Sequence, residues 1–254
     1  MLRKSVILLA LFLFAVLSLP SVSAQDKADP SQPLPFYLLT IRGTLATPTL
    51  DAAVTLHNST AGASESVAAA QSLGDLSHTI YLPMQPAKSG AGEVLFIDQW
   101  NSIDGLNKFF ANPTVQEQAG QIFSQRDATV WTPAPGFYSY HLAAPYKSTD
   151  RITVLVRGTV HSREDALALH NQIVASNINA AHKAGDITHE VYFMLTPPDQ
   201  PESLEFLALD VWTSAEGMQA YYGNPDFQAG VMKLFTAAPT LSIWNPTSGD
   251  WIEW

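Results

Sequence analysis

Apolar and polar residues follow the same order twice along the chain. Residues 37–140 contain the segments LLTIRGTL, VTLHN, LGDLSHTIYL, VLFIDQWNSIDGLNKFFANPTVQ and ATVWTPAPGF. Residues 152–254 contain ITVLVRGTV, LALHN, AGDITHEVYF, FLALDVWTSAEGMQAYYGNPDFQ and LSIWNPTSGDW, and matched positions lie 111 to 115 residues apart. The chain is therefore an internal duplication, whose copies we call repeat 1 and repeat 2.

Each copy is predicted to contain four core strands. Short runs rich in apolar and β-branched residues, bounded by polar turns, indicate strands. The polar segments QPAKSGAG and TPPDQPES separate the two middle strands of each copy, which predicts antiparallel hairpins. The predicted strands are residues 37–45, 77–84, 94–100 and 128–132 in repeat 1, and residues 152–160, 188–195, 204–212 and 240–245 in repeat 2.

A long helix of about six turns is expected between the first two strands of each copy. Thr47, followed by Pro48, is expected to cap it in repeat 1, and Ser162 is expected to do so in repeat 2. Both helices are expected to end at a glycine, Gly74 or Gly185, because glycine adopts the left-handed conformation at low cost. A second helix, broken at an Asn-Pro pair, is expected after the third strand.

The order strand, helix, strand, strand, helix, strand predicts a ferredoxin-like βαββαβ unit in each copy. Helices cover one face of such a sheet and leave the other open, so two units are expected to pack face to face. The predicted fold class is therefore α+β, with tandem ferredoxin-like domains packed as a pseudo-twofold dimeric α/β barrel. The duplication supplies both halves of this pseudo-dimer within one chain.

The first residues have the order of a secretory signal. Arg3 and Lys4 precede an apolar run, and Val22-Ser23-Ala24 provides small residues for cleavage. We therefore expect a secreted or periplasmic protein. The expected organisation is a signal peptide at 1–24, a polar lead-in at 25–36, repeat 1 at 37–142, a linker at 143–151 and repeat 2 at 152–254.

Charge and cysteine content exclude several classes of function. The formal net charge is −10, which opposes binding to nucleic acid or, after signal cleavage, to an anionic membrane. The chain has no cysteine, so disulfides, thiol catalysis and thiolate metal sites are excluded.

Two histidines in each copy are candidate site residues. His57 and His170 lie in the predicted long helices on the face that carries apolar residues. His78 and His189 lie on strands, and alternation places each with apolar neighbours on an inward face. Each could be a neutral imidazole paired within the core, or a base or ligand that faces a pocket.

Asp98 and Asp210 are the matching carboxylates. Each shares its strand face with apolar residues and needs a partner there, because burial of an unpaired carboxylate is costly. A histidine–aspartate pair is the economical arrangement, and a metal site of two histidines and one carboxylate is the alternative. Arg42 and Arg157 on the first strands are expected to neutralise these aspartates or to bind a substrate anion.

The run from GD-x-SH through the Asp-x-Trp pairs to Asn-Pro-x-x-Gln resembles the antibiotic-biosynthesis monooxygenase domain of the dimeric α/β-barrel superfamily. The resemblance covers nearly all of both copies. The acidic residue and tryptophan of the family's third strand are matched by Asp98 and Trp100, and by Asp210 and Trp212. The family often has a histidine in the next helix, where this chain has Phe109-Phe110 and Tyr221-Tyr222.

The resemblance implies a cofactor-independent oxygenase of a small aromatic or quinol-like molecule, with no flavin, haem or metal. His78 or His57 would remove a phenolic proton, Trp100 would pack against the ring and Asp98 would orient a histidine. In repeat 2 the corresponding residues are His189, His170, Trp212 and Asp210.

A non-catalytic module that binds a small apolar ligand or a protein partner is the alternative. The two hypotheses differ in what surrounds the histidines: a cavity of about 300 Å³ or more favours an enzyme. A filled core in which every histidine is bonded favours a scaffold.

Overall fold

The computed structural model describes residues 36–85, 90–142 and 151–254, which belong to one compact unit at 35–254. The predicted signal peptide, the lead-in apart from Phe36 and the linker apart from Arg151 lie outside the described residues. None of the helices in the described ranges is long and apolar enough to cross a membrane.

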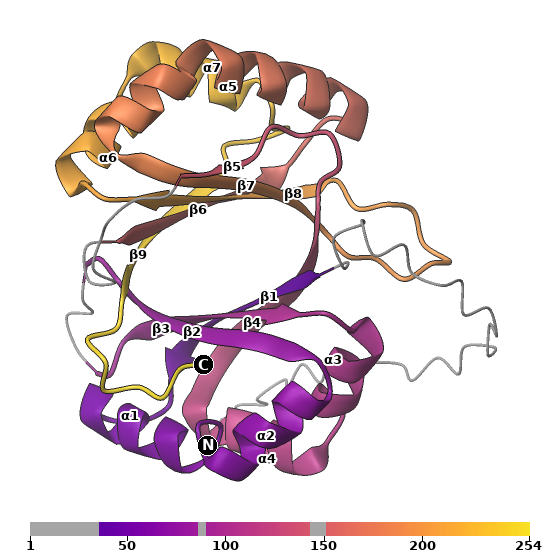
Figure 1. Cartoon of the computed structure of the whole chain (residues 1–254), viewed down its shortest axis with the longest axis vertical. Coiled ribbons are helices and arrows are strands. Elements are labelled where there is room, and N and C mark those ends of the chain that lie inside the picture. The colour runs from indigo at the N-terminus through magenta and orange to yellow at the C-terminus, as the bar shows by residue number, and fades with distance from the viewer. Residues whose placement is uncertain (1–35, 86–89, 143–150) are drawn as a thin grey trace, which may run out of the picture. The chain divides into compact units, whose positions relative to one another are not determined.

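Antiparallel strands close into a barrel (Figure 1). Repeat 1 supplies the order β4-β1-β3-β2 and repeat 2 the order β9-β6-β8-β7, and the pairs β2–β9 and β4–β7 join the two sheets. The predicted fold class, two ferredoxin-like units in one pseudo-twofold barrel, is confirmed. The strands are β1 Tyr37–Leu45, β2 Asp75–Pro83, β3 Glu93–Trp100, β4 Phe123–Pro133, β5 Tyr140–His141, β6 Ile152–Thr159, β7 Asp186–Met194, β8 Glu205–Trp212 and β9 Thr240–Pro246.

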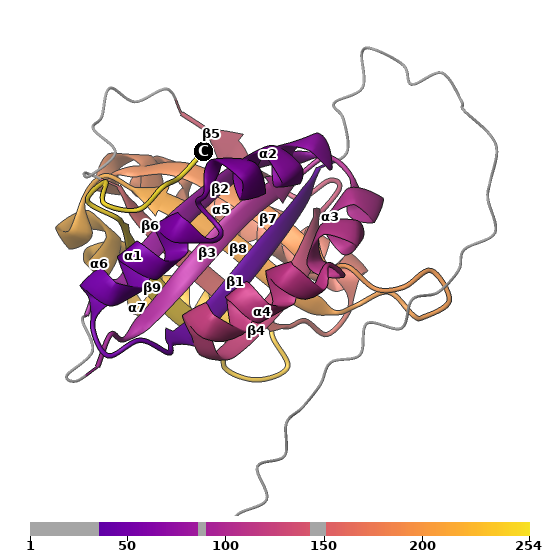
Figure 2. The same ribbon diagram turned by 90° about the horizontal axis from the view of Figure 1, so that it is seen from below.

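Helices cover the outer face of each half of the barrel. In Figure 2 the helices of repeat 1 lie across the sheet formed by β1, β2 and β3, and the helices of repeat 2 cover the other half in Figure 1. The helices are α1 Leu50–Ser59, α2 Ser64–Ser72, α3 Ile103–Phe110, α4 Pro113–Ile122, α5 Arg163–Ala184, α6 Ala215–Tyr222 and α7 Pro225–Met232.

The long helix is continuous in repeat 2 and broken in repeat 1. As predicted, Ser162 caps α5 by accepting a hydrogen bond from the Asp165 amide, and Gly185 ends it with φ +104°. In repeat 1 the predicted single helix is wrong: α1 and α2 are separate, because the chain between His57 and His78 is two residues longer than between His170 and His189.

The cap of the first helix also differs from the prediction. Thr49, rather than Thr47, accepts a hydrogen bond from the Ala52 amide. The hydroxyl of Thr47 donates instead to the Thr49 carbonyl, so Thr47 and Pro48 belong to the turn before the helix. The broken second helices follow the prediction, with Asn112 and Asn224 as caps.

Buried side chains form three cores. One lies between helices and sheet in repeat 1 around Trp100, and another lies in the same place in repeat 2 around Trp212. The third fills the barrel interior and includes Trp131 and Trp244. All four tryptophans are buried, as predicted from their strand positions.

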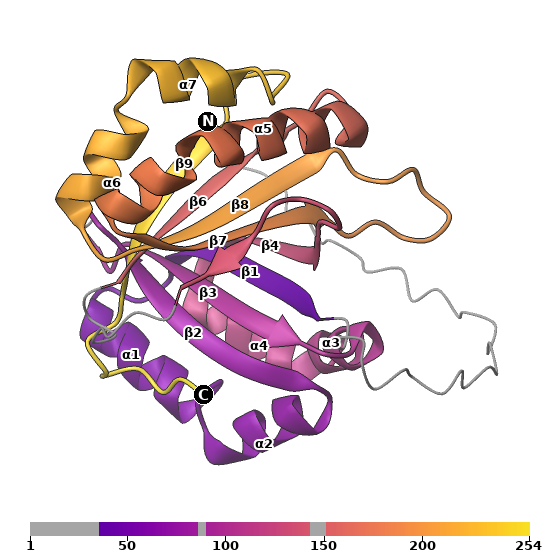
Figure 3. The ribbon, with the colours of Figure 1, turned by 45° about the horizontal axis from the view of Figure 1, so that its top comes forward.

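The segment after the last strand of each repeat crosses to the other repeat. After β4, Tyr140 pairs with His189 on β7. After β9, the backbone of Trp254 exchanges two hydrogen bonds with His78 on β2, and Figure 3 shows this C-terminal segment passing along α1. We call residues 134–141 and 247–254 the crossing segments.

Candidate functional site

The two histidines and the aspartate of repeat 2 form one hydrogen-bonded series. His170 comes from α5, His189 from β7 and Asp210 from β8, where it lies opposite His189 in the strand register. The Nε2 atoms of the two histidines lie 2.9 Å apart, and His189 Nδ1 lies 2.5 Å from Asp210 Oδ1. We call these three residues the repeat 2 triad.

The neighbours of the triad determine where its protons lie. Asn171 donates its side-chain N–H to the Gly136 carbonyl, so its oxygen accepts from His170 Nδ1. Burial and the positive charge of His189 lower the pKa of His170 to about 4. Burial alone would lower the pKa of His189, but the charge and hydrogen bond of Asp210 raise it overall.

His170 is therefore neutral near pH 7, and its Nε2 accepts a hydrogen bond. The donor is His189 Nε2, so His189 is protonated on both ring nitrogens in this arrangement. His189 donates from Nε2 to His170 and from Nδ1 to Asp210. All four ring nitrogens are occupied, so neither imidazole has a lone pair left to accept a substrate proton.

Repeat 1 contains the same arrangement, which we call the repeat 1 triad. His57 Nε2 lies 3.2 Å from His78 Nε2, and His78 Nδ1 lies 2.6 Å from Asp98 Oδ1. Asn58 bonds His57 Nδ1 as Asn171 bonds His170. Burial lowers the pKa of His57 to about 4.

The space around the repeat 1 triad is filled by aromatic rings. Phe96 packs edge-on against both imidazoles, with ring centroids 5.4 Å from His57 and 5.0 Å from His78. Trp251 packs against His57, and Trp254 stacks on His78 at 4.5 Å. His57 is completely buried and His78 is 5% exposed, which is the environment expected of a scaffold.

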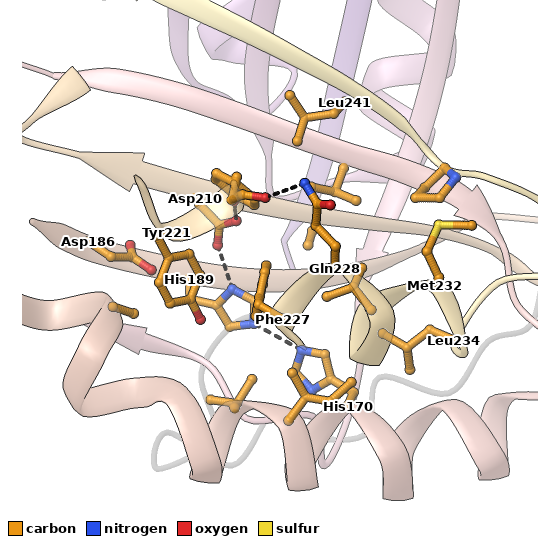
Figure 4. A pocket seen from close by; sticks show the side chains of 18 of the residues that line it. His170, Asp186, His189, Asp210, Tyr221, Phe227, Gln228, Met232, Leu234 and Leu241 are labelled. Carbon is orange, nitrogen blue, oxygen red and sulfur yellow. Dashed lines mark hydrogen bonds and ion pairs between the residues drawn. The ribbon is translucent and has the colours of Figure 1, made fainter. Parts of the chain in front are cut away.

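A pocket of about 320 Å³ lies beside the repeat 2 triad (Figure 4). Figure 4 shows the triad on one wall, with Met232 and Leu234 on the other side of the space. The size falls at the lower end of the range for small-molecule sites. Its polar lining is Tyr140, His170, Asp186, His189, Asp210, Tyr221, Tyr222 and Gln228, and its apolar lining includes Val156, Ile173, Val174, Phe206, Ala208, Phe227, Val231, Met232, Leu234, Phe235 and Leu241.

One position accounts for much of this difference between the repeats. Ala208 of β8 occupies the site that Phe96 occupies on β3, two residues before the aspartate of each triad. Phe206 carries the aromatic ring of repeat 2 instead, where repeat 1 has the smaller Val94. Moving the ring two residues along the same strand face leaves open the space next to His189 and Asp210.

The tryptophans predicted to contact substrate lie behind the pocket. Trp212 is fully buried and its ring packs against Tyr221 and Tyr222, and it does not line the pocket. Trp100 is packed in the same way on Phe109 and Phe110. Their positions do not support the predicted substrate-binding role.

The predicted pairing of Arg42 with Asp98 and of Arg157 with Asp210 is wrong. Leu39, not Arg42, lies opposite Asp98, so the arginine and the aspartate project from opposite faces of the sheet. Arg42 binds Glu93 and lies over Trp244.

Arg157 has the same surroundings in repeat 2. It binds Glu205 and Asp127 and lies over Trp131. Arg157 does not line the pocket, so the predicted role of both arginines in substrate binding has no support from their positions.

Sequence reasoning missed the aspartate that follows the glycine at the end of each long helix. Asp186 lines the pocket, is 3% exposed, and accepts a hydrogen bond of 2.7 Å from the Tyr140 hydroxyl on Oδ2. Its Oδ1 is buried and has no hydrogen-bond partner among the described residues. The Gly-Asp pair in both copies was the available signal.

Burial and the nearby negative charge of Asp210 raise the pKa of Asp186 to about 8, although Tyr140 and His189 partly oppose this. Asp75 is the matching residue of repeat 1. Trp254 donates to its Oδ2, and burial followed by the charge of Asp98 raises its pKa to about 7. Asp75 does not line the pocket.

The triads do not have the geometry of the three-ligand metal site considered above. Each aspartate bonds the Nδ1 atom of a histidine whose Nε2 atom faces the other histidine, so three ligand atoms do not converge on one point. His182 is partly buried, and its ring packs edge-on against Tyr140 with centroids 4.7 Å apart.

Comparison with known proteins extends the fold assignment. No protein-family model and no curated protein matches the chain. Among solved structures, an anthrone oxidase-like protein matches with a TM-score of 0.59 at 15% identity, over 85% of this chain and 92% of that chain.

Two further structures belong to proteins described as "putative monooxygenase". The one from Fusobacterium nucleatum has a TM-score of 0.56 at 8% identity, over 85% of this chain and 94% of its own. The one from Lactobacillus acidophilus has a TM-score of 0.52 at 10% identity, over 84% and 94%. The chain thus has the ferredoxin-like, dimeric α/β-barrel fold of monooxygenase-like proteins.

Proposed function

We propose that the chain is a cofactor-independent oxygenase that binds a small phenol or quinol in the repeat 2 pocket and oxidises it with dioxygen. The observation that carries the proposal is an apolar cavity of about 320 Å³ with the triad on one wall. Apolar walls suit an aromatic ring, and a few convergent polar groups suit its hydroxyl. The likeness to an anthrone oxidase-like protein is consistent with this class of substrate.

The reaction balances without a bound cofactor. A quinol gives two electrons and two protons to dioxygen and forms a quinone and hydrogen peroxide, whereas a phenol with an unsubstituted para carbon reacts as follows. Loss of the phenolic proton gives a phenolate, which transfers one electron to dioxygen and forms a phenoxyl radical and superoxide. The two radicals combine at the para carbon, and cleavage of the O–O bond with loss of the para hydrogen gives a para-quinone and water. One oxygen atom of dioxygen enters the ring and the other leaves in water.

The pocket supplies an electrostatic environment for these charges. The charge and hydrogen bond of Asp210 raise the pKa of His189, which favours its positively charged form. A fixed positive charge in a water-poor cavity stabilises a phenolate and superoxide more than bulk water does. In this proposal the triad acts as a charged wall rather than as the proton acceptor.

Oxygen consumption with a panel of phenols and quinols tests the proposal. We expect uptake of one dioxygen per quinone formed. Ala208→Phe should abolish uptake because its ring fills the pocket, and Phe96→Ala at the matched position of repeat 1 should leave uptake within about twofold. Absence of uptake with every compound would refute the oxygenase proposal.

A binding module without turnover is the second candidate. The occupied ring nitrogens of the triad favour it, because they leave neither histidine free as a base. Saturable binding of a phenol that Ala208→Phe removes, without oxygen uptake, would support this candidate.

We also propose that the protein acts after export. The signal-like order of residues 1–24 supports this proposal. Expression of the full sequence in a secreting bacterial host should yield a mature protein that begins at Gln25, as read by N-terminal sequencing.

A further inference from the structure

The repeat 2 pocket contains one buried acceptor atom that the protein itself does not use. Asp186 begins β7 next to a bulge in its pairing with β8, which separates it from the regular register of the strand. Oδ2 accepts from Tyr140, whereas Oδ1 is buried without a partner. An unpaired buried carboxylate oxygen is costly and calls for an explanation.

The triad residues on this wall already have hydrogen-bond partners. The ring nitrogens of His170 bond Asn171 and His189, and those of His189 bond His170 and Asp210. Asp210 also accepts from the Tyr222 hydroxyl through Oδ2. Asp186 Oδ1 is thus a buried lining oxygen that has no hydrogen-bond partner among the described residues.

We propose that Asp186 is the catalytic residue that binds the hydroxyl of the aromatic substrate and takes its proton. This inference rests on the proposed function and names the base that the triad does not provide. The O–H bond of the phenol breaks, its proton moves to Oδ1 of Asp186 and its electron pair stays on the phenolate. Protonation also removes the negative charge that Asp186 would otherwise hold near Asp210.

Repeat 1 completes this site. Tyr140 lies on β5, in the crossing segment of repeat 1, and its hydroxyl occupies Oδ2, which leaves Oδ1 for a ligand in the pocket. Asp75 is equally buried and its Oδ1 likewise has no partner among the described residues, but its Oδ2 receives the Trp254 N–H and the triad of its repeat is enclosed by aromatic rings. Asp75 therefore provides a matched control, buried like Asp186 but outside the pocket.

The ionisation of Asp186 depends on groups from five elements around it. Below pH 8 it is mainly protonated, and above pH 8 it is mainly an anion that accepts a hydroxyl proton. The titratable groups that face it or its Tyr140 partner are Tyr140 on β5, His189 on β7, Asp210 on β8, Tyr221 and Tyr222 on α6, and His182 on α5.

Calorimetric titration under anaerobic conditions tests the assignment apart from turnover. The probes are 2-naphthol and 2-methoxynaphthalene, which have similar shapes but differ in the O–H donor. At pH 8.5 we expect Asp186→Asn to bind 2-naphthol at least about tenfold more weakly than the native chain, the value of a hydrogen bond to a charged group. At pH 6, where Asp186 is protonated, the difference should be within about twofold.

The controls separate an acceptor role from a structural role. Asp75→Asn should match the native chain with both probes at both pH values. Binding of 2-methoxynaphthalene should be the same in all three proteins, which also shows that the pocket of Asp186→Asn is intact. If Asp186→Asn does not fold, the native chain alone should bind 2-naphthol, relative to 2-methoxynaphthalene, more tightly at pH 8.5 than at pH 6.

The contrary outcomes are distinct. Binding of 2-naphthol that Ala208→Phe abolishes but Asp186→Asn leaves unchanged at pH 8.5 would overturn the assignment of Asp186 alone. An equal loss in Asp75→Asn would also overturn it. Failure of the native chain to bind 2-naphthol would overturn the proposed function together with this inference.

Discussion

Phe96 and Ala208 occupy the same position in two otherwise similar triads. Phe96 contacts both imidazoles of repeat 1, whereas Ala208 leaves the corresponding volume of repeat 2 open. The bonds within each triad are the same, and repeat 2 adds a bond from Tyr222 to Asp210 where repeat 1 has Phe110, so the difference between a filled core and a pocket arises mainly from side-chain volume. Access to the triad therefore depends on a residue that has no polar group.

Replacement of Phe96 by alanine should open a cavity next to His57 and His78. We expect the free energy of unfolding to fall by about 3–5 kcal/mol, the usual cost of a buried phenylalanine truncation. Ala208→Phe should leave stability within about 1 kcal/mol of the native value, because its ring enters existing space. Urea denaturation of both variants measures this, and a similar loss in each would contradict the proposed difference in packing.

Alternation along the strands was enough to predict that four polar side chains point into a core, and in the structure this core lies between the sheet and the helices. They are His78, His189, Asp98 and Asp210. It could not show what fills the space before them, because the walls come from α5, α7 and other strands. The arginine pairing failed for a related reason: whether Arg42 and Asp98 lie on the same face depends on the register between their strands, and a shift of one residue reverses it. Asp186 was missed because a strand-initial residue next to a bulge does not follow the alternation.

At the scale of elements, an asparagine next to the helix histidine holds each crossing segment. Asn171 accepts from the Tyr138 amide and donates to the Gly136 carbonyl, while also binding His170. Asn58 has the same contacts with the amide of Ile252 and the carbonyl of Asp250. Each asparagine thus links the proton arrangement of its own triad to a segment from the other repeat.

Replacement of either asparagine by alanine should loosen one crossing segment and leave the other in place. Loss of two backbone contacts should cost about 1–3 kcal/mol. Amide hydrogen exchange should become faster at Tyr138 in Asn171→Ala and at Ile252 in Asn58→Ala. Each variant is the control for the other, and faster exchange at both amides in one variant would show that the segments are not independent.

The extent to which element positions could be predicted also differed between the copies. In repeat 2 the helix cap, its length and its final glycine all followed from local residues. In repeat 1 the same reasoning placed one helix where there are two. The chain between His57 and His78 has two additional residues, and the break between Ser59 and Ser64 accommodates them while the two histidines still meet.

For the whole molecule, buried ionisable groups make stability depend on pH. Folding raises the pKa of Asp75 to about 7 and of Asp186 to about 8, so their protonated forms stabilise the fold at low pH and this contribution is lost as pH rises through those values. Folding lowers the pKa of His57 and His170 to about 4, so their contribution is lost as pH falls from about 6.5 to 4. The two effects oppose each other below pH 6.5.

Above pH 6.5 the aspartates act without that opposition, and the raised pKa of His189 has the same sign. We therefore expect the free energy of unfolding to fall between pH 6.5 and pH 8.5. The double variant Asp75→Asn, Asp186→Asn should show a clearly smaller fall in urea denaturation over this range. An unchanged slope in the double variant would mean that these carboxyls do not titrate in the folded chain.

The crossing segments between the two repeats have a consequence for how such a protein can change over time. In a barrel built from two identical chains, every substitution appears at both sites, so a change that improves one site alters its twin. Here each half still closes the other, but each is encoded separately. Repeat 1 can maintain the scaffold with Phe96 while repeat 2 varies around Ala208, and assembly of the two halves does not depend on protein concentration.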